Sequence, residues 1–292
     1  MTDTRRARRR VFLGGYVNDT NAQNLNCRAL ARYLDPTRYE VGCLSVYSGD
    51  LDTPDSIDHV FQSNWPNRLT APLAYVRGLL WSDIAYLPHR RFLSILQPLA
   101  RLLRRPLFTT VEGLLDGPNI ASGVAVFGSR ATLLESYRGF SACYAITRAV
   151  AEYNRQHLGI STDPDHLLQL GVDHAVHSKP TDPKRGLQSV LFVGRLIERK
   201  GIFEVIELAR RRPGLSVHIA GDGEAVQMVA AAARSLPNLR VHGLLPQNQI
   251  ADLMSDVDLL LLPSRSEGFL RVVLETSLRG CAIDTLSGLW RG

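Results

Sequence analysis

Lysine is scarce in this chain of 292 residues, which has 34 basic residues but lysine only at Lys179, Lys184 and Lys200. Surface charge therefore falls mostly to arginine, and a lysine on a loop is informative. The net charge of +6 says little about nucleic acid, because five arginines and one aspartate lie within the first ten residues. Basic residues interleaved with aromatics are also absent. Nucleic acid is therefore not an expected partner.

Paired cysteines and long apolar runs are missing too. The four cysteines are scattered without a Cys-x-x-Cys pair, which is typical of reduced, buried thiols in a cytoplasmic protein. No apolar run has the length of a membrane-spanning helix. Arg9-Arg10 imitates the start of an export signal, but the apolar stretch behind it ends at Val17. We expect a cytoplasmic protein, which would work at the inner face of the membrane if its partner is a lipid.

What the chain does contain is an alternation of short apolar runs with segments of helical periodicity, and 45% of its residues are hydrophobic. The pattern predicts an α/β protein made of doubly wound parallel sheets. Strands are expected at 11–13, 40–47, 56–61, 83–87, 107–110, 141–146, 166–170, 189–193, 215–220, 239–241, 257–262 and near 282. Helices are expected at 22–34, 71–80, 91–103, 119–137, 148–158, 203–211, 224–234 and 248–255, and after Glu267.

The composition changes at HSKPTDPKRG, which has two prolines and no apolar run. We therefore expect a basic tail at 1–10, a first Rossmann-like domain at 11–176, a linker at 177–188 and a second domain at 189–292. Two such domains predict a cleft between them for a small molecule. The last expected strand has no helix behind it, so the second domain is expected to be incomplete.

The stretch DLLLLPSRSEGFLRVVLETSLRG, from Asp258 to Gly280, combines a buried strand, a polar loop and a helix. Ligands of open α/β sheets bind beyond the carboxyl ends of the strands, and a helix N-terminus suits an anion. Glu267 and Glu275 are candidate ligand-binding carboxylates here, with two solvated charges as the alternative. Asp256-Val-Asp258 imitates a metal-binding pair, but Asp258 begins a buried strand, and a structural role is favoured.

The second domain opens with VLFVGRLIERKG, in which Gly194, Arg195, Lys200 and Gly201 lie between a strand and a helix. Two cations in this position can neutralise a diphosphate; a solvated basic turn is the alternative. The loop is not a Walker loop, and no Gly-x-Gly-x-x-Gly fingerprint occurs.

Together, VLFVGRLIERKG, HIAGDGE, VHGLLP and DLLLLPSRSEGFLRVVLE resemble the donor-binding half of retaining family-4 glycosyltransferases with the GT-B fold, and LGVDHAVH resembles the segment that closes their N-terminal domain. The resemblance covers about 165–280, and the first half only in layout. It implies transfer of a sugar from a nucleotide sugar to an acceptor that the sequence does not identify, lipid-linked or a polysaccharide precursor. The alternative is a truncated, non-catalytic relative of these enzymes that acts as a binding or interaction protein.

The resemblance also assigns roles to single residues. Arg195 and Lys200, with Gly194 beside them, would hold the diphosphate without a metal or other cofactor, since fixed cations can stabilise a leaving group. Glu267 would contact the donor sugar and Glu275 the ribose. The remaining donor contacts would come from the backbone of Gly268, Phe269, Leu270 and Arg271, and from Leu244 and Leu245 beside the base.

The first half departs from the family. Asn21-Ala22 replaces the usual glycine at the start of the first helix, so Gly14 and Gly15 are the candidates for close approach of the backbone to a ligand. Glu112 stands where the family has a histidine; it would serve the acceptor or be an ordinary loop charge. Arg90 to Leu96 and Leu99 to Arg105 alternate basic and apolar residues. This pattern fits a peripheral membrane contact, but a core-packed helix with outward arginines is favoured.

Overall fold

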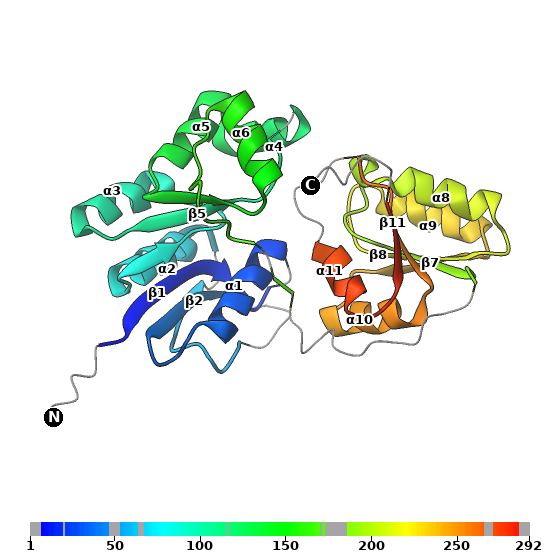
Figure 1. Cartoon of the computed structure of the whole chain (residues 1–292), viewed down its shortest axis with the longest axis horizontal. Coiled ribbons are helices and arrows are strands. Elements are labelled where there is room, and N and C mark those ends of the chain that lie inside the picture. The colour runs from blue at the N-terminus through cyan, green and yellow to red at the C-terminus, as the bar shows by residue number, and fades with distance from the viewer. Residues whose placement is uncertain are drawn as a thin grey trace. The chain divides into compact units, whose positions relative to one another are not determined.

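The computed structural model describes residues 7–19, 21–46, 53–63, 67–115, 117–169, 171–172, 186–265 and 271–285. The chain divides into two units, Met1–Gly171 and Val172–Gly292 (Figure 1). Each unit contains a sheet whose strand pairs are all parallel. The predicted pair of doubly wound α/β domains is therefore confirmed. Residues 177–185 of the predicted linker lie outside the described residues.

The first unit has a six-stranded sheet in the order β3-β2-β1-β4-β5-β6. Its strands are β1 (Arg9–Tyr16), β2 (Tyr39–Val46), β3 (His59–Ser63), β4 (Ile84–Tyr86), β5 (Leu107–Val111) and β6 (Ala142–Ala145). Its helices are α1 (Ala22–Tyr33), α2 (Asn67–Trp81), α3 (Leu93–Leu103), α4 (Gly117–Phe127), α5 (Arg130–Arg138) and α6 (Arg148–Leu158).

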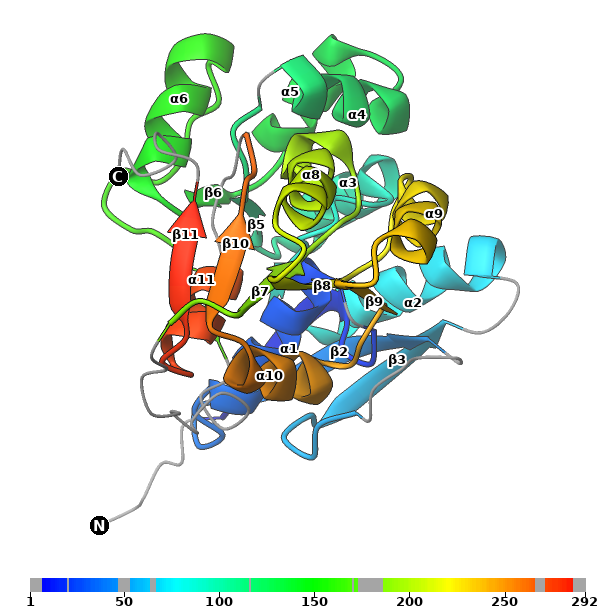
Figure 2. The same ribbon diagram turned by 90° about the vertical axis from the view of Figure 1, so that its right-hand side faces the viewer.

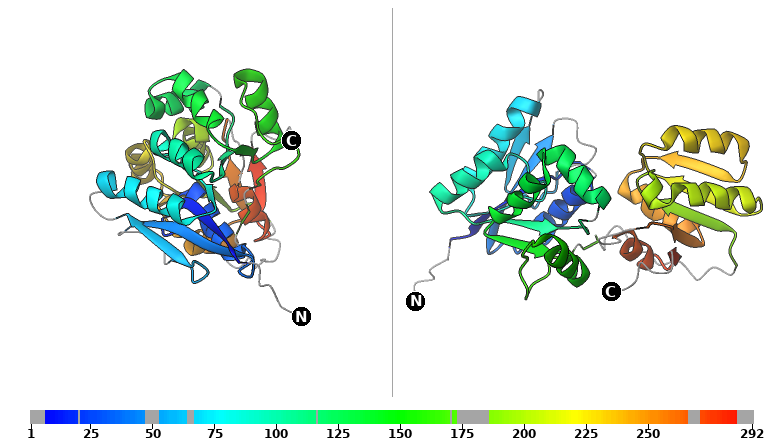
Figure 3. Two further views of the ribbon diagram at one scale, coloured as in Figure 1. Left: turned by 90° about the vertical axis from the view of Figure 1, so that its left-hand side faces the viewer. Right: turned by 90° about the horizontal axis from the view of Figure 1, so that it is seen from above.

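Both faces of this sheet are buried, which explains the continuous apolar runs of its central strands. Val11 and Leu13 of β1 pack with α1 residues in one core cluster. Phe12, between them, points to the other face and packs against Tyr75 of α2 and Leu96 of α3. Successive side chains of β1 point to opposite faces of the sheet, so this strand packs against helices on both faces. Figure 3 shows the helices and the sheet in two further views.

The second unit has a five-stranded sheet in the order β11-β10-β7-β8-β9. Its strands are β7 (Ser189–Val193), β8 (Ser216–Ala220), β9 (Leu239–Gly243), β10 (Leu259–Leu262) and β11 (Ala282–Thr285). A short 3-10 helix, η1 (Glu198–Lys200), precedes α8 (Ile202–Arg211), and the other helices are α9 (Val226–Ser235), α10 (Gln247–Asp256) and α11 (Arg271–Ser277).

This sheet is also covered on both faces (Figure 2). Val190 and Phe192 of β7 pack in the cluster built by α8 and α9, whereas Leu191 packs in the cluster built by α10 and α11. Asp258 has the structural role predicted for it. Its Oδ2 accepts hydrogen bonds from the backbone N–H groups of Gln188 and Ser189, at 2.9 and 2.8 Å, and from the Ser189 hydroxyl.

Several predicted elements differ from the structure. The strand expected at 166–170 is wrong for 166–169, because this segment makes one backbone hydrogen bond to β6, from Leu168 N to Ala145 O. The single helix expected at 119–137 is two helices, α4 and α5. The chain turns at Gly128, whose φ is 81°, and the Ser129 side chain then caps α5.

The first strand is longer than the expected 11–13, since β1 runs from Arg9 to Tyr16 and includes both glycines of Gly14-Gly15. The favoured interpretation of 91–103 is supported, because Leu93, Leu96 and Ala100 of α3 are buried; contact with a membrane stays a prediction. Among the described residues, no helix is long and apolar enough to cross a membrane.

Candidate functional site

The second sheet has its topological switch point between β7 and β10. The chain continues from β7 to β8 on one side, whereas β10 pairs with β7 on the other. Open α/β sheets bind ligands at the carboxyl ends of such strands. The segment from Gly194 to Gly201 follows β7, and Pro263, Ser264 and Arg265 follow β10. The structure therefore brings the two predicted donor-binding loops to one edge of one sheet.

Glycines allow the loops at this edge to approach closely. Gly201 has a φ of 78°, and a β-carbon there would overlap the carbonyl oxygen of Pro263. A β-carbon at Gly221, which follows β8, would overlap the carbonyl oxygen of Gly194. At Gly223 it would stand 2.7 Å from the carbonyl oxygen of Leu196. Side chains at these positions would force the loops apart, so glycine sets their spacing.

Backbone hydrogen bonds fix the same loops. Leu196 N donates to Asp222 O at 2.9 Å, which ties the loop after β7 to the loop after β8. Arg265 N donates to Arg199 O at 3.0 Å, which ties the loop after β10 to η1. The peptide group of Arg199, which precedes Lys200, is therefore hydrogen-bonded directly to the loop that follows β10.

Arg265 reinforces this junction with its side chain. Its guanidinium lies 3.1 Å from the carboxylate of Glu204 on α8 and 3.5 Å from that of Glu198 on η1. No sequence motif marks Arg265 as part of this junction. Its two glutamate partners lie more than sixty positions earlier in the chain. The periodicity of a helix or strand cannot predict a contact between residues so far apart in the sequence.

Both predicted cations lie on the segment between β7 and α8. Arg195 is exposed directly after Gly194, and Lys200 is half-buried at the end of η1. Ile197 is hydrogen-bonded to both residues through its backbone, since its N–H donates to Arg195 O and its carbonyl oxygen accepts from Lys200 N. The segment thus keeps a compact turn with one cation at each end.

Glu275 is buried within α11 and is already bound by protein groups. The Arg271 Nε atom donates to its Oε1 at 3.0 Å, one helical turn away, and the Gln247 Nε2 atom donates at 3.4 Å. Both the Arg271 and the Glu275 side chains are only 11% exposed. The carboxylate is therefore held in one orientation by α10 and α11, as a hydrogen-bond acceptor for a ligand would need to be.

The other predicted donor contacts differ in how far the structure describes them. Leu244 is 68% exposed after β9, and Leu245 packs partly into the α10 and α11 core cluster. Gly194 begins the loop after β7, where its N–H donates to Ala220 O. Four predicted site residues lie outside the described residues: Glu267, Gly268, Phe269 and Leu270.

In the first unit, protein side chains fill the space beside both predicted glycines. A β-carbon at Gly14 would stand 2.7 Å from Leu87, and one at Gly15 would stand 2.6 Å from the sulfur of Cys27. Close packing inside the unit therefore accounts for the absence of a side chain at both positions. Their predicted approach to a ligand stays a prediction.

Glu112 follows β5 and is half-buried. Burial raises the pKa of its carboxyl above the ordinary value, against the opposing effect of hydrogen bonds from Thr110 and Gln23. The Thr110 hydroxyl donates to Glu112 Oε1 at 2.8 Å, and Tyr86 Oη lies 2.9 Å from the same hydroxyl. Glu112 is therefore part of an ordered polar network at the carboxyl end of β5, rather than a fully solvated loop charge.

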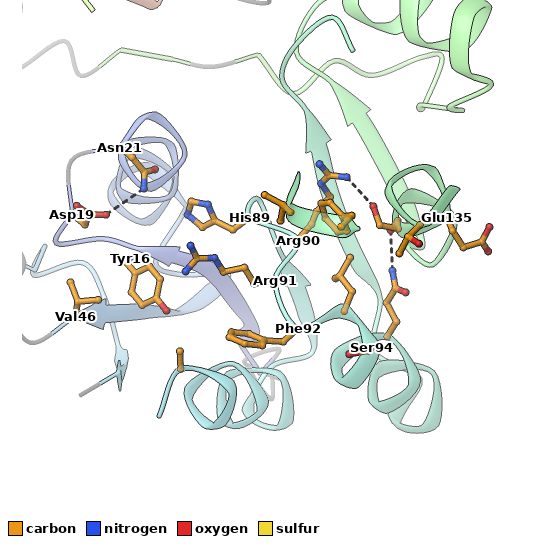
Figure 4. Close-up of a pocket in the computed structure, with 17 residues that line it drawn as sticks. Tyr16, Asp19, Asn21, Val46, His89, Arg90, Arg91, Phe92, Ser94 and Glu135 are labelled. Carbon is orange, nitrogen blue, oxygen red and sulfur yellow. Dashed lines mark hydrogen bonds between the residues drawn. The ribbon is translucent and has the colours of Figure 1, made fainter. Parts of the chain in front are cut away.

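The first unit also contains a cavity of about 1140 Å³ that the sequence analysis did not locate. It lies where the first sheet has its own switch point, between β1 and β4 (Figure 4). Among its lining residues are Tyr16, Asp19, Asn21, His89, Arg91 and Phe127. Of these residues, only Arg91 belongs to a segment for which the sequence suggested a function, namely the membrane contact considered for Arg90 to Leu96. The lining comes from distant parts of the chain, so no local motif marks it.

The sequence of this chain is similar to those of several known glycosyltransferases. Residues 174–283 match the family model described as glycosyl transferases group 1. The chain is 33% identical over 110 residues to a glycogen synthase of Mycobacterium tuberculosis, a match that covers 35% of this chain and 27% of that protein. It is 26% identical over 167 residues to the lipopolysaccharide core biosynthesis glycosyltransferase LpsE of Rhizobium meliloti, covering 55% and 48%. These matches span between a quarter and a half of the relatives' own lengths.

Among solved structures, Anabaena HepE in complex with UDP-glucose superposes with a TM-score of 0.67 at 19% identity, covering 95% of this chain and 80% of that chain. At this identity the likeness shows the fold, which is that of GT-B glycosyltransferases. The family match falls on the unit that carries the Arg195 and Lys200 segment. Residues 174–283 of the second unit are therefore similar to the glycosyl transferases group 1 family.

Proposed function

We propose that this protein is a retaining glycosyltransferase of the family-4 type, which moves a hexose from a nucleotide sugar to an acceptor. The observation that carries the proposal is the junction of the loops after β7 and β10, with Arg195 and Lys200 on one of them. The group 1 domain match covers both loops. HepE, which shares the fold, has been solved with UDP-glucose, so UDP-glucose is the first donor to test.

In this proposal Arg195 and Lys200 neutralise the diphosphate. Negative charge builds up on that group as the glycosidic bond breaks, and cations already in position stabilise it without reorganisation. Gly194 and the backbone from Gly268 to Arg271 lie around the diphosphate and the sugar. No metal is required by this arrangement, because two fixed cations supply the charge.

The remaining roles follow the same arrangement. Glu267 contacts the donor sugar, and Glu275, held by Arg271 and Gln247, accepts a hydrogen bond from the ribose. Leu244 and Leu245 lie beside the base. In the first unit Glu112 serves the acceptor, and the backbone at Gly14 and Gly15 closely approaches a ligand. The acceptor belongs to polysaccharide or glycolipid synthesis, and the protein works in the cytoplasm, at the inner membrane surface when the acceptor is lipid-linked.

Thermal unfolding with and without UDP-glucose tests donor binding. A ligand that binds only the folded protein at a hundred times its dissociation constant adds about 2.7 kcal/mol of stability, which raises the melting temperature measurably. Lys200→Ala should abolish the shift, and the anomeric configuration of any product reports retention. A full shift in Lys200→Ala would contradict the assigned role.

A further inference from the structure

The cavity of the first unit is built around the loop that follows β4. This loop has two non-glycine residues in the left-handed region, Arg90 with a φ of 49° and Phe92 with a φ of 56°. Each costs about 1 kcal/mol or more, so surrounding contacts must hold them. Backbone strain of this kind is common at binding sites, where it presents a side chain that a relaxed loop would turn away.

The residues on either side of Arg91 are anchored. The Arg90 guanidinium donates to the Ser136 hydroxyl at 2.9 Å and lies 4.0 Å from the centre of the Tyr137 ring. The Phe92 ring packs edge-on against Tyr75 at 5.3 Å. Arg91 lies between these two anchored neighbours and also lines the cavity, where its side chain points toward Tyr16 (Figure 4).

Arg91 is exposed and forms no ion pair within the part of the chain that the structure describes. Two carboxylates also line the cavity, but each has protein donors of its own. Asp19 accepts from the Asn24 side-chain amide at 2.7 Å, and Glu135 pairs with Arg138 at 3.0 Å. The Arg91 guanidinium therefore lines the cavity without an ion pair to either of these carboxylates.

His89 contributes a hydrogen-bond acceptor. The Asn24 side-chain oxygen accepts from the backbone N–H of Tyr16 at 2.9 Å, which fixes the amide orientation. His89 Nε2 lies 2.7 Å from that same oxygen, so Nε2 must carry the proton and donate. In the neutral ring Nδ1 is then the acceptor, and it can receive a hydrogen bond from a ligand hydroxyl.

The rest of the wall is mainly apolar and includes Val46, Val126 and the rings of Phe92 and Phe127. A cavity of about 1140 Å³ is at the upper end of small-molecule sites. Apolar walls with a few convergent polar groups suit a ring that is polar at its edge and has C–H groups on its faces. A sugar with an anionic substituent combines all three requirements, namely an anion for Arg91, a hydroxyl for His89 and C–H faces for the wall.

We propose that this cavity binds an anionic carbohydrate, with Arg91 as the counter-ion of its phosphate or carboxylate and His89 Nδ1 as the acceptor for one of its hydroxyl groups. Binding itself follows from the geometry of the first unit. That the bound carbohydrate is the acceptor of glycosyl transfer rests on the proposed function.

Isothermal titration of the full chain without nucleotide tests the site with three probes: glucose 1-phosphate, glucuronate and uncharged glucose. At least one anionic probe should bind at least tenfold more tightly than glucose, and the better one identifies the anion. Arg91→Ala should weaken its binding tenfold or more, because a charge-assisted contact is lost. Arg101→Ala, which removes an exposed arginine of α3 that does not line the cavity, should leave binding unchanged.

The proposal would be overturned if glucose and both anions bound equally well, or if neither anion bound. Unchanged binding of the anion by Arg91→Ala would also overturn it. Near-ultraviolet circular dichroism checks that Arg91→Ala is folded, and Arg91→Lys should retain part of the affinity. Nucleoside diphosphate binding is titrated separately on the same samples. Failure at the cavity therefore does not count against the donor site, and the reverse also holds.

Discussion

Replacement of Gly201 by alanine is the sharpest perturbation of the junction in the second unit. Gly201 joins η1 to α8 with a φ of 78°, which costs an alanine about 1 kcal/mol or more. The added methyl group would overlap the Pro263 carbonyl oxygen and stand 2.6 Å from Pro263 Cγ. Overpacking of this kind costs about 1–3 kcal/mol. We expect Gly201→Ala to destabilise the second unit by about 3 kcal/mol.

Gly214→Ala is the matched control, since a β-carbon at Gly214 would meet no atom within 4 Å. Amide hydrogen exchange of β8, read by mass spectrometry, measures opening of the second unit within the full chain. In Gly201→Ala exchange should accelerate by about two orders of magnitude, which corresponds to about 3 kcal/mol. Gly214→Ala should exchange within a factor of about two of the wild type. Equal exchange in both variants would refute the assigned packing of the two loops.

Two further predictions concern half-buried polar groups. Burial, with the charge of Arg91, lowers the pKa of His89 to about 4 from an ordinary 6.5. The unfolded chain therefore takes up the proton first, and stability should fall by up to about 3 kcal/mol as pH drops from 6.5 to 4. His89→Gln keeps a donor for Asn24 and should lose less stability in urea titrations over this range; an identical loss would contradict the neutral ring. Asp258→Ala should cost about 1–3 kcal/mol, because three donors at Gln188 and Ser189 lose their acceptor, whereas exposed Asp252→Ala should be neutral in hydrogen exchange of β7.

Elements with a clear local signal were predicted well from the sequence. The strand at Ser189–Val193 agrees at both ends, because a short apolar run stands between polar residues and a glycine. The helix at Arg148–Leu158 also agrees, with Thr147 as its cap and Gly159 in the left-handed region behind it. Such boundaries depend on neighbouring residues alone, which explains why the sequence sufficed.

Features that depend on distant residues were not predictable. Gly14-Gly15 is typical of a loop after a strand, yet both residues belong to β1, and Leu87 and Cys27 occupy the space of their missing side chains. The ion pairs of Arg265 and the cavity around Arg91 unite parts of the chain that no spacing connects. The loops after β7 and β10 were predicted to bind a donor because their residues resemble a known family, whereas the first half of the chain resembles that family only in layout.

The central claim is that Arg195 and Lys200 bind the diphosphate of a sugar donor. The most direct measurement is calorimetric titration of UDP into the full chain, comparing the wild type with the double variant Arg195→Ala and Lys200→Ala. Loss of two charged contacts should weaken UDP binding a hundredfold or more. The control Arg212→Ala, which removes an exposed arginine at the end of α8, should bind UDP like the wild type. Wild-type affinity in the double variant would contradict the claim.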